Sequence, residues 1–340
     1  MYRSGGPILR ALITGIGGFA GSHLAEYLCG TSGIEVVGVL SPRGSTANVD
    51  AIGATVDLDR IDLHRVDLLD GDSVRALLDI VQPDQVYHLA AHASVGASWQ
   101  DPAATLHNNI TAQVNILQAL AESGARPRVL VVASAEEYGR VEAHDLPVDE
   151  ETPLRPVNPY AVSKVAQDYM GLQYYLSHDL PIVRVRPFNH SGPRQDLGYV
   201  IPDFSSQIAQ IEAGLQEPLL RVGNLDAERD LHDVRDTVRA YHLALEHGKA
   251  GEVYNVGGSQ AYAIREVLDR LLALSRVAVN VEPDPERMRP SDVPRIVADC
   301  GKLERETGWA PAYSLDRTLH DTLEYWRERV QRARPTLTTH

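Results

Sequence analysis

The sequence is poor in the residues that build covalent or metal frameworks. Only two of its 340 residues are cysteine, Cys29 and Cys300, and they lie far apart in the chain. Two cysteines are too few for a disulfide framework or a structural zinc site. We therefore expect no metal, and a reducing compartment fits.

A long hydrophobic run is also missing. No apolar stretch approaches the roughly 20 residues that a membrane-spanning helix needs. The first ten residues, MYRSGGPILR, lack the apolar core of a signal peptide. These features predict no membrane partner and a cytoplasmic location.

Lysine is scarce as well, and arginine supplies nearly all the positive charge. The formal net charge is -14, and lysine occurs only at positions 164, 249 and 302. Nucleic acids and anionic lipids both require a basic face, so neither is expected as a partner. An anionic ligand would have to be held by local arginines and by helix N-termini.

What the sequence does contain is a regular alternation of short apolar runs and long amphipathic stretches. Strands are expected at 10–14, 35–40, 62–66, 85–90, 128–134 and 181–187, and helices at 18–30, 73–81, 103–123 and 159–178. This order predicts an α/β fold of the Rossmann type, a doubly wound parallel sheet. Shorter elements after Pro187 predict a smaller C-terminal lobe. We expect residues 1–187 to form mainly the cofactor domain and 188–340 mainly the substrate-binding lobe, with some chain crossing back to the sheet.

A glycine-rich turn follows the first expected strand. The stretch TGIGGFAG (14–21) has the spacing G-x-x-G-x-x-G and leads into an expected helix. Glycines allow a tight turn and close approach of the backbone to a pyrophosphate, which the helix N-terminus favours. A dinucleotide site is therefore predicted, and a purely structural turn is the alternative. The expected contacts are Gly15, Gly17, Gly18, Phe19, Ala20 and Gly21.

The end of the second strand indicates which dinucleotide is bound. A carboxylate there would accept a hydrogen bond from a ribose hydroxyl and mark NAD, whereas an arginine suits a 2′-phosphate. The residues are VLSPRGS, with Ser41 and Arg43 and no acid. NADP(H) is predicted, with NAD(H) as an alternative, although Arg43 could be a plain surface residue.

The stretch NPYAVSK carries the strongest catalytic pattern. It places Tyr160 and Lys164 four residues apart on one face of an expected helix. An ammonium beside a phenol stabilises the phenolate and should lower the pKa of Tyr160 toward neutrality. Ser134, at the end of an earlier strand, could share the substrate oxygen. Glu136 and Glu137 follow it, either as a solvated loop or with one of them as a base.

With these motifs in place, the chain resembles the extended short-chain dehydrogenases/reductases that modify nucleotide sugars. The resemblance rests on TGIGGFAG, HLAA (88–91), SAEEYG (134–139), YAVSK (160–164) and RPFNHSGP (186–193), and it extends from about residue 8 to 326. It implies a catalytic triad of Ser134, Tyr160 and Lys164. Further cofactor contacts implied are Asp67 and Leu68 by the adenine, Leu89, Ala90, Ala91 and Pro187, with Asn109 near the active site. Substrate contacts implied or expected are Glu136, Asn189, Val200, Arg221, Asn224, Arg229 and Arg289.

Motifs of the second lobe are similar to those of family members that act on GDP-linked sugars. They include GYVIPDF (198–204), VGNLDAERDLHDVRD (222–236) and RMRPSDVP (287–294). This resemblance implies reduction of the C4 ketone of a GDP-4-dehydro-6-deoxy-sugar by NADPH, giving GDP-D-rhamnose. The alternative is 4,6-dehydration of GDP-mannose, in which Glu136 would remove the C5 proton. Arg194 departs from the reductase pattern, where glycine is usual.

A third reading is a catalytically silent NADP-sensing protein. The intact set of Ser134, Tyr160 and Lys164 counts against it, because a sensor needs none of them. The helices expected at 103–123 and 159–178 carry apolar residues such as Ile116 and Tyr169. Enzymes of this family often pair these helices across a two-fold axis, so a homodimer through a four-helix bundle is expected.

Overall fold

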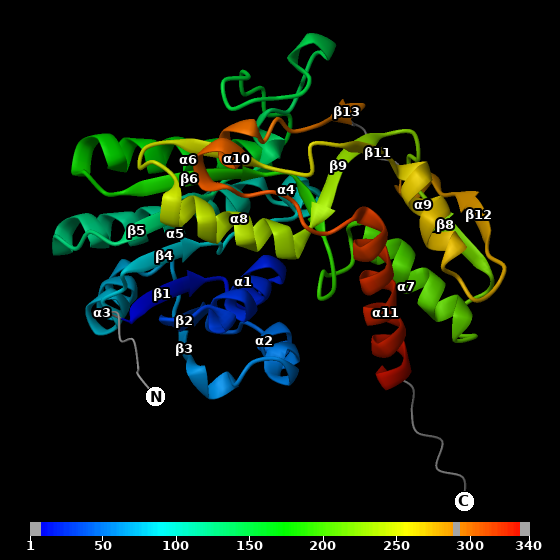
Figure 1. Cartoon of the computed structure of the whole chain (residues 1–340), viewed down its shortest axis with the longest axis horizontal. Helices are drawn as coiled ribbons and strands as arrows, with labels where there is room; N and C mark the ends of the chain where they lie inside the picture. Colours follow the sequence, from blue (N-terminus) through cyan, green and yellow to red (C-terminus); the bar gives the residue numbers. More distant parts are fainter. Residues whose placement is uncertain (1–7, 288–292, 334–340) are drawn as a thin grey trace, which may run out of the picture.

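The computed structural model describes residues 8–287 and 293–333, and its larger part is built on one parallel sheet (Figure 1). The strand order is β10-β6-β5-β4-β1-β2-β3, with every neighbouring pair parallel. The strands are β1 (Leu9–Thr14), β2 (Ile34–Leu40), β3 (Ile61–Arg65), β4 (Gln85–His88), β5 (Arg128–Val132), β6 (Ile182–Pro187) and β10 (Val253–Val256). The predicted Rossmann-type sheet is confirmed.

Helices cover both faces of this sheet because its inner strands are apolar on both sides. Successive residues point to opposite faces, so Ile13 packs in one core cluster and Leu12 in the other. One face carries α1 (Phe19–Gly30), α8 (Val234–His247) and α10 (Gly301–Thr307). The other carries α3 (Gly71–Val81), α5 (Pro102–Ser123) and α6 (Pro159–His178).

Short elements fill the connections between the strands. They are α2 (Ala47–Ala51), α4 (Val95–Gln100) and the 3-10 turns η1 (Ile52–Ala54), η2 (Leu58–Arg60), η3 (Ala135–Glu137), η4 (Ala143–Asp145) and η5 (Pro285–Arg287). Strands β4 and β5 end earlier than predicted, at His88 and Val132. The chain leaves β5 to enter η3, which Ser134 caps, so that Ser134 lies in a turn and not in a strand.

The remaining elements surround a third core cluster beside the sheet. Helices α7 (Val200–Glu212), α9 (Ile264–Ala273) and α11 (Leu315–Ala333) pack there with the pair β8 (Leu219–Val222) and β12 (Asn280–Pro283). A small sheet joins β7 (Asn189–Ser191), β9 (Glu228–Asp233), β11 (Ala261–Ala263) and β13 (Arg295–Ile296). Between these elements the chain returns to the large sheet, where β10 pairs with β6.

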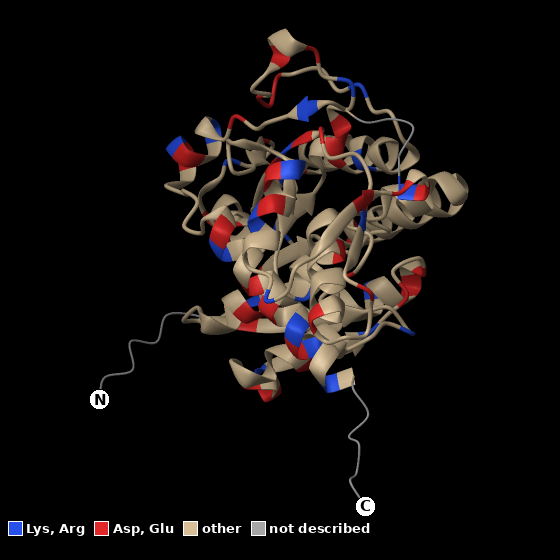
Figure 2. Ribbon diagram, turned by 90° about the vertical axis from the view of Figure 1, so that its right-hand side faces the viewer, with Lys and Arg blue, Asp and Glu red and all other residues tan. Residues whose placement is uncertain are grey.

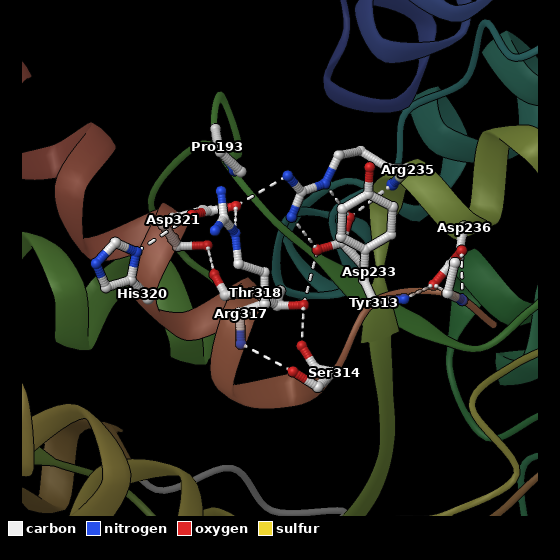
Figure 3. Close-up of polar contacts among 12 residues, drawn as sticks. Pro193, Asp233, Arg235, Asp236, Tyr313, Ser314, Arg317, Thr318, His320 and Asp321 are labelled. Carbon is white, nitrogen blue, oxygen red and sulfur yellow. Dashed lines mark hydrogen bonds and ion pairs between the residues drawn. The ribbon is translucent and has the colours of Figure 1, made fainter.

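A buried carboxylate at the start of α8 joins the elements around the large sheet to those of the third core cluster (Figure 3). Asp233 caps α8 and accepts hydrogen bonds from the Arg235 backbone N–H at 2.8 Å and from the Thr318 hydroxyl at 2.7 Å. Arg235 pairs with Asp233 at 2.7 Å and with Asp321 of α11 at 2.9 Å. Its guanidinium also lies 3.9 Å from the centre of the Tyr313 ring. Helix α11 is thereby fixed to the strand that leads into α8.

Segments with Lys or Arg and segments with Asp or Glu are interspersed along the ribbon in the view of Figure 2. Within residues 8–287 and 293–333, no helix combines the length and the apolarity that crossing a bilayer would require.

Candidate active site

The glycine-rich turn lies between β1 and α1, and its glycines are required by close packing. Gly15 has φ +75°, and a Cβ there would lie 2.9 Å from the backbone of Ala90. A Cβ on Gly21 would lie 2.2 Å from the Gly15 carbonyl oxygen. Gly18 caps α1 without a side chain, so backbone N–H groups are presented at the helix start, next to Phe19 and Ala20. This cradle fits the pyrophosphate of a dinucleotide.

The loop after β2 holds the residues predicted to choose the cofactor. Ser41 and Arg43 are exposed there. Arg65, at the end of the neighbouring strand β3, donates to the carbonyl oxygens of Ser41 and Pro42 at 3.4 Å and of Gly44 at 2.8 Å. The loop therefore carries Arg43, and its backbone is held by Arg65. Arg65 escaped the sequence reading because only the pairing of β2 with β3 brings it to this loop.

Residues predicted to line the cofactor follow the carboxyl ends of the parallel strands, where such ligands bind in open α/β sheets. Asp67 and Leu68 come after β3, Leu89, Ala90 and Ala91 after β4, and Pro187 ends β6. The Ala90 N–H donates to the Thr14 hydroxyl at 3.2 Å.

Asn109 has a bridging position beside them. Its side chain is buried, accepts from the His92 N–H at 2.7 Å and donates to the Ser163 hydroxyl at 2.9 Å. It thus ties the loop after β4 to helix α6, next to Lys164, rather than pointing freely into a cleft.

The three predicted catalytic residues come together. Tyr160 lies in the first turn of α6, and its hydroxyl is hydrogen-bonded to Ser134. The Lys164 Nζ lies 5.9 Å from the centre of the Tyr160 ring and donates to the Val132 carbonyl at 2.8 Å. All three side chains are buried. A proton donor and a second hydroxyl thus share one small site at the edge of the sheet.

The electrostatics of this group differ from the expectation. Burial raises the pKa of Tyr160, and the hydrogen bond with Ser134 opposes that shift only in part. The predicted lowering of the Tyr160 pKa is therefore wrong for this structure, because burial raises that pKa and the Lys164 ammonium is turned toward Val132. Burial also lowers the pKa of Lys164 to about 8, with Glu137 opposing. A neutral phenol is the form that can give a proton away.

The two glutamates after Ser134 occupy different surroundings. Glu136 is half-buried and accepts from the Asn158 side-chain amide at 3.0 Å, close enough to Tyr160 to raise the pKa of its phenol. Glu137 is fully buried on the inner side of the turn. The expectation that Glu136 and Glu137 form a solvated loop is therefore not met, because neither side chain is exposed. Asn158, which also caps α6 through the Ala161 N–H at 2.8 Å, was missed although it belongs to the motif NPYAVSK.

The predicted substrate residues are spread over the smaller group of elements. Asn189 is exposed in β7, Val200 begins α7, and Asn224 accepts from the Asp226 N–H at 2.9 Å. Arg229 donates to the Val293 carbonyl at 2.6 Å. Arg289 lies outside the described residues.

Arg221 lies on a hollow surface next to α7. It lines a cavity of about 470 Å³ together with Asp203, Gln207 and Arg287. Arg287 was not singled out from the sequence. Tyr199, immediately before α7, was also missed, and it lies near enough to Tyr160 to raise the pKa of that phenol. The segment that leads into α7 therefore reaches Tyr160.

Arg194, the departure from the reductase pattern, has a structural role here. It has φ +71°, a region that favours glycine, and its side chain pairs with Glu26 of α1 at 2.6 Å. The neighbouring Pro193 carbonyl accepts from the His23 ring at 2.8 Å if that nitrogen carries the proton. Arg194 thus holds its loop against α1.

Comparisons with known proteins agree with this geometry. The family model described as GDP-mannose 4,6 dehydratase matches residues 12–322. A GDP-6-deoxy-D-mannose reductase of Pseudomonas aeruginosa is 36% identical over 95% of this chain and 98% of its own length. GDP-mannose 4,6 dehydratase 2 of Arabidopsis thaliana is 32% identical, over 90% of this chain and 84% of its own.

A solved structure shows the same fold with a cofactor present. The structure of RMD from Pseudomonas aeruginosa complexed with NADPH superposes with a TM-score of 0.81 at 35% identity. The match covers 94% of this chain and 99% of that one. The fold is therefore shared along nearly the whole length of both chains.

Proposed function

The chain belongs to the GDP-mannose 4,6 dehydratase family of extended short-chain dehydrogenases/reductases, and from that membership we propose that it reduces the C4 ketone of a GDP-4-dehydro-6-deoxy-sugar with NADPH, giving GDP-D-rhamnose. The observation that carries this proposal is the match to a GDP-6-deoxy-D-mannose reductase over nearly all of both chains. The dehydratase of Arabidopsis thaliana is less similar, and a smaller share of its length is covered.

The chain's own residues suit a reduction that ends in proton transfer. NADPH, when bound on the glycine-rich turn, supplies the hydride. The buried, neutral Tyr160 donates its proton to the C4 oxygen, and the Ser134 hydroxyl holds that oxygen in place. Lys164, whose Nζ lies 5.9 Å from the centre of the Tyr160 ring, places a positive charge in the same site while it remains protonated.

The cofactor proposal rests on the charges around the loop after β2. Arg43 lies in that loop without a nearby acid in the sequence, and Arg65 holds its backbone. Two guanidinium groups suit a 2′-phosphate better than a plain ribose hydroxyl. NADP(H) is the proposed cofactor, and NAD(H) is the weaker alternative.

Dehydration of GDP-mannose is the second candidate, and Glu136 favours it. A dehydratase needs a base that removes the C5 proton, and the Glu136 carboxylate is held by Asn158 next to Tyr160. A reductase has no such step. The position of Glu136 is therefore compatible with both reactions, and only the reaction products distinguish them.

One experiment separates the two functions. The purified protein is given GDP-mannose or GDP-4-dehydro-6-deoxy-mannose, each with and without NADPH, while NADPH oxidation and sugar products are followed. We expect NADPH oxidation only with the keto sugar, and Glu136→Gln to keep that rate within about tenfold. If GDP-mannose is converted to the keto sugar without net NADPH use, and Glu136→Gln abolishes this conversion, the protein is a dehydratase.

A further inference from the structure

Glu137 is a fully buried carboxyl group to which the reduction described above assigns no task. It lies directly behind the catalytic group, in the turn that Ser134 caps. One carboxyl oxygen, Oε1, accepts a hydrogen bond from the Ser134 backbone N–H at 2.9 Å. The side chain of Glu137 therefore fixes the backbone that carries the Ser134 hydroxyl.

The other oxygen of Glu137 faces a crowded ionic cluster. Oε2 lies 3.4 Å from Arg186 Nε, yet among the described residues it finds no hydrogen-bond donor. The three nitrogens of Arg186 are engaged elsewhere. Nε and Nη2 bond the Asp168 carboxylate at 2.8 and 2.7 Å, and Nη1 donates to the Tyr138 hydroxyl and the Glu150 carbonyl at 3.2 and 3.1 Å.

Asp168 shares a nitrogen of Arg186 with Glu137. Arg186 Nε lies 2.8 Å from Asp168 Oδ2 and 3.4 Å from Glu137 Oε2. The Asp168 carboxylate is fully buried and also pairs with Arg184 at 2.6 Å. Two buried carboxyl groups that share one guanidinium nitrogen cannot both be ionised without a large cost in free energy. A proton between them removes the repulsion and gives the unpaired oxygen a hydrogen bond. Consistently, burial and the neighbouring negative charge of Asp168 raise the pKa of Glu137, and the positive charge of Arg186 opposes this shift.

We propose that Glu137 carries a proton and acts as a positioning residue, accepting from the Ser134 N–H and donating to Asp168. Asp168 lies one turn after Lys164 on α6, so this link joins the turn of Ser134 to the helix of Tyr160 and Lys164. It fixes the distance between the hydroxyls of Ser134 and Tyr160. The effect on turnover rests on the proposed reduction, whereas the protonation does not.

The charged and titratable groups around Glu137 all belong to this arrangement. They are Asp168, Lys164 and Tyr160 from α6 and Arg186 from β6. The negative charge of an ionised Glu137 would raise the pKa of both Lys164 and Tyr160, so its ionisation would also disturb the catalytic pair. A protonated Glu137 leaves that pair undisturbed over the range in which the reaction is expected to run.

Two substitutions test whether Glu137 acts through its hydrogen bonds or only by filling volume. Glu137→Gln imitates the protonated group, since its amide oxygen accepts from Ser134 and its amide nitrogen donates to Asp168. Glu137→Met fills a similar volume and makes neither bond. For ketone reduction we expect kcat of the Gln variant within about threefold of wild type, and kcat of the Met variant lowered about tenfold or more with KM for NADPH little changed. Equal losses in both variants, or no loss in the Met variant, would overturn the positioning role.

Thermal unfolding tests the proton without any substrate. A carboxyl group whose folded pKa is raised stabilises the fold fully below its unfolded value of about 4.3, and this stabilisation is lost as the pH rises toward the folded value. Glutamine does not titrate, so Tm of Glu137→Gln relative to wild type should rise between pH 5 and pH 9. Glu136→Gln is the matched control and should show no such trend. A difference that stays flat with pH refutes the protonated Glu137, whereas absence of ketone reduction in the wild type refutes only the proposed function.

Discussion

Burial of Lys164 disfavours the positive charge that the proposed reduction requires. Burial lowers its pKa to about 8, so the charge that the reduction uses is held only weakly. A group with this pKa is an ammonium below pH 8 and a neutral amine above it. We therefore expect kcat/KM for ketone reduction to fall as the pH rises through about 8.

Substitution at position 164 checks this assignment. Lys164→Arg keeps a charge that does not titrate, so the falling limb near pH 8 should disappear even if the rate is lower. Lys164→Met should weaken both turnover and NADPH binding. A falling limb that persists in the Arg variant would show that another group titrates.

The choice of cofactor is also decided by single residues. Removing a charged partner of the 2′-phosphate costs about 1.5 to 3 kcal/mol, so Arg43→Ala should weaken NADPH selectively over NADH. Arg65→Met should act in the same direction by loosening the loop that carries Arg43. Arg60→Ala, a nearby exposed arginine, is the control and should change neither affinity.

Calorimetric titrations of the four proteins with NADPH and NADH measure both affinities. Equal losses for the two cofactors in Arg43→Ala would refute contact with the 2′-phosphate. Equal losses in Arg65→Met alone would mean that Arg65 supports the loop without influencing cofactor choice.

Residues of this kind show where sequence reasoning reached its limit. The family resemblance is confirmed, and Ser134, Tyr160 and Lys164 meet as their motifs predicted. Arg65 and Asp168 carry no local signal, because their roles arise from neighbouring strands and from a buried contact between α6 and β6. The expected lowering of the Tyr160 pKa failed for a related reason, since spacing along a helix says nothing about how much solvent is lost.

At the scale of elements, hydrophobic periodicity predicted the strands and helices of the sheet well. The main errors were at the carboxyl ends of β4 and β5, where the chain leaves the sheet to form the site. There, local hydrogen bonds replace the strand ladder, as when Ser134 and Glu137 cap η3. Such turns depend on side-chain contacts that apolar alternation does not encode.

The attachment of α11 to the start of α8 gives a prediction about stability. Asp233 is fully buried and is paired mainly by Arg235. Arg235→Ala would leave a buried carboxylate short of a partner, and we expect the free energy of unfolding to fall by roughly 3 kcal/mol.

Arg317→Ala is the matched control, because Arg317 pairs with the same Asp321 at 2.8 Å but has a side chain that is 64% exposed. Exposed pairs contribute about 0 to 1 kcal/mol, so this variant should differ little from wild type. Urea denaturation measures both values. Similar losses in the two variants would show that the buried Asp233 does not depend on Arg235.

At the scale of the whole molecule, one face of α6 exposes apolar side chains to solvent. Val162, Tyr169 and Leu176 recur at intervals of seven residues, which places them on one side of the helix, and they are 45%, 54% and 68% exposed. Helix α6 packs beside α5, so the two helices present a broad surface together. Apolar side chains gathered on one face are typical of contact surfaces between proteins.

The predicted homodimer would bury this face by pairing α5 and α6 with their copies across a two-fold axis. We expect the wild type to elute with about twice the chain mass of 37.3 kDa in size-exclusion chromatography with light scattering. Leu176→Asp would bury an unpaired charge in the proposed contact and should give the monomer mass, because such a charge in a dry interface is strongly unfavourable. Ile80→Asp is the control, since Ile80 is an apolar residue 70% exposed on α3, outside the proposed contact. A monomeric wild type, or a Leu176→Asp variant that remains dimeric, would contradict the four-helix arrangement.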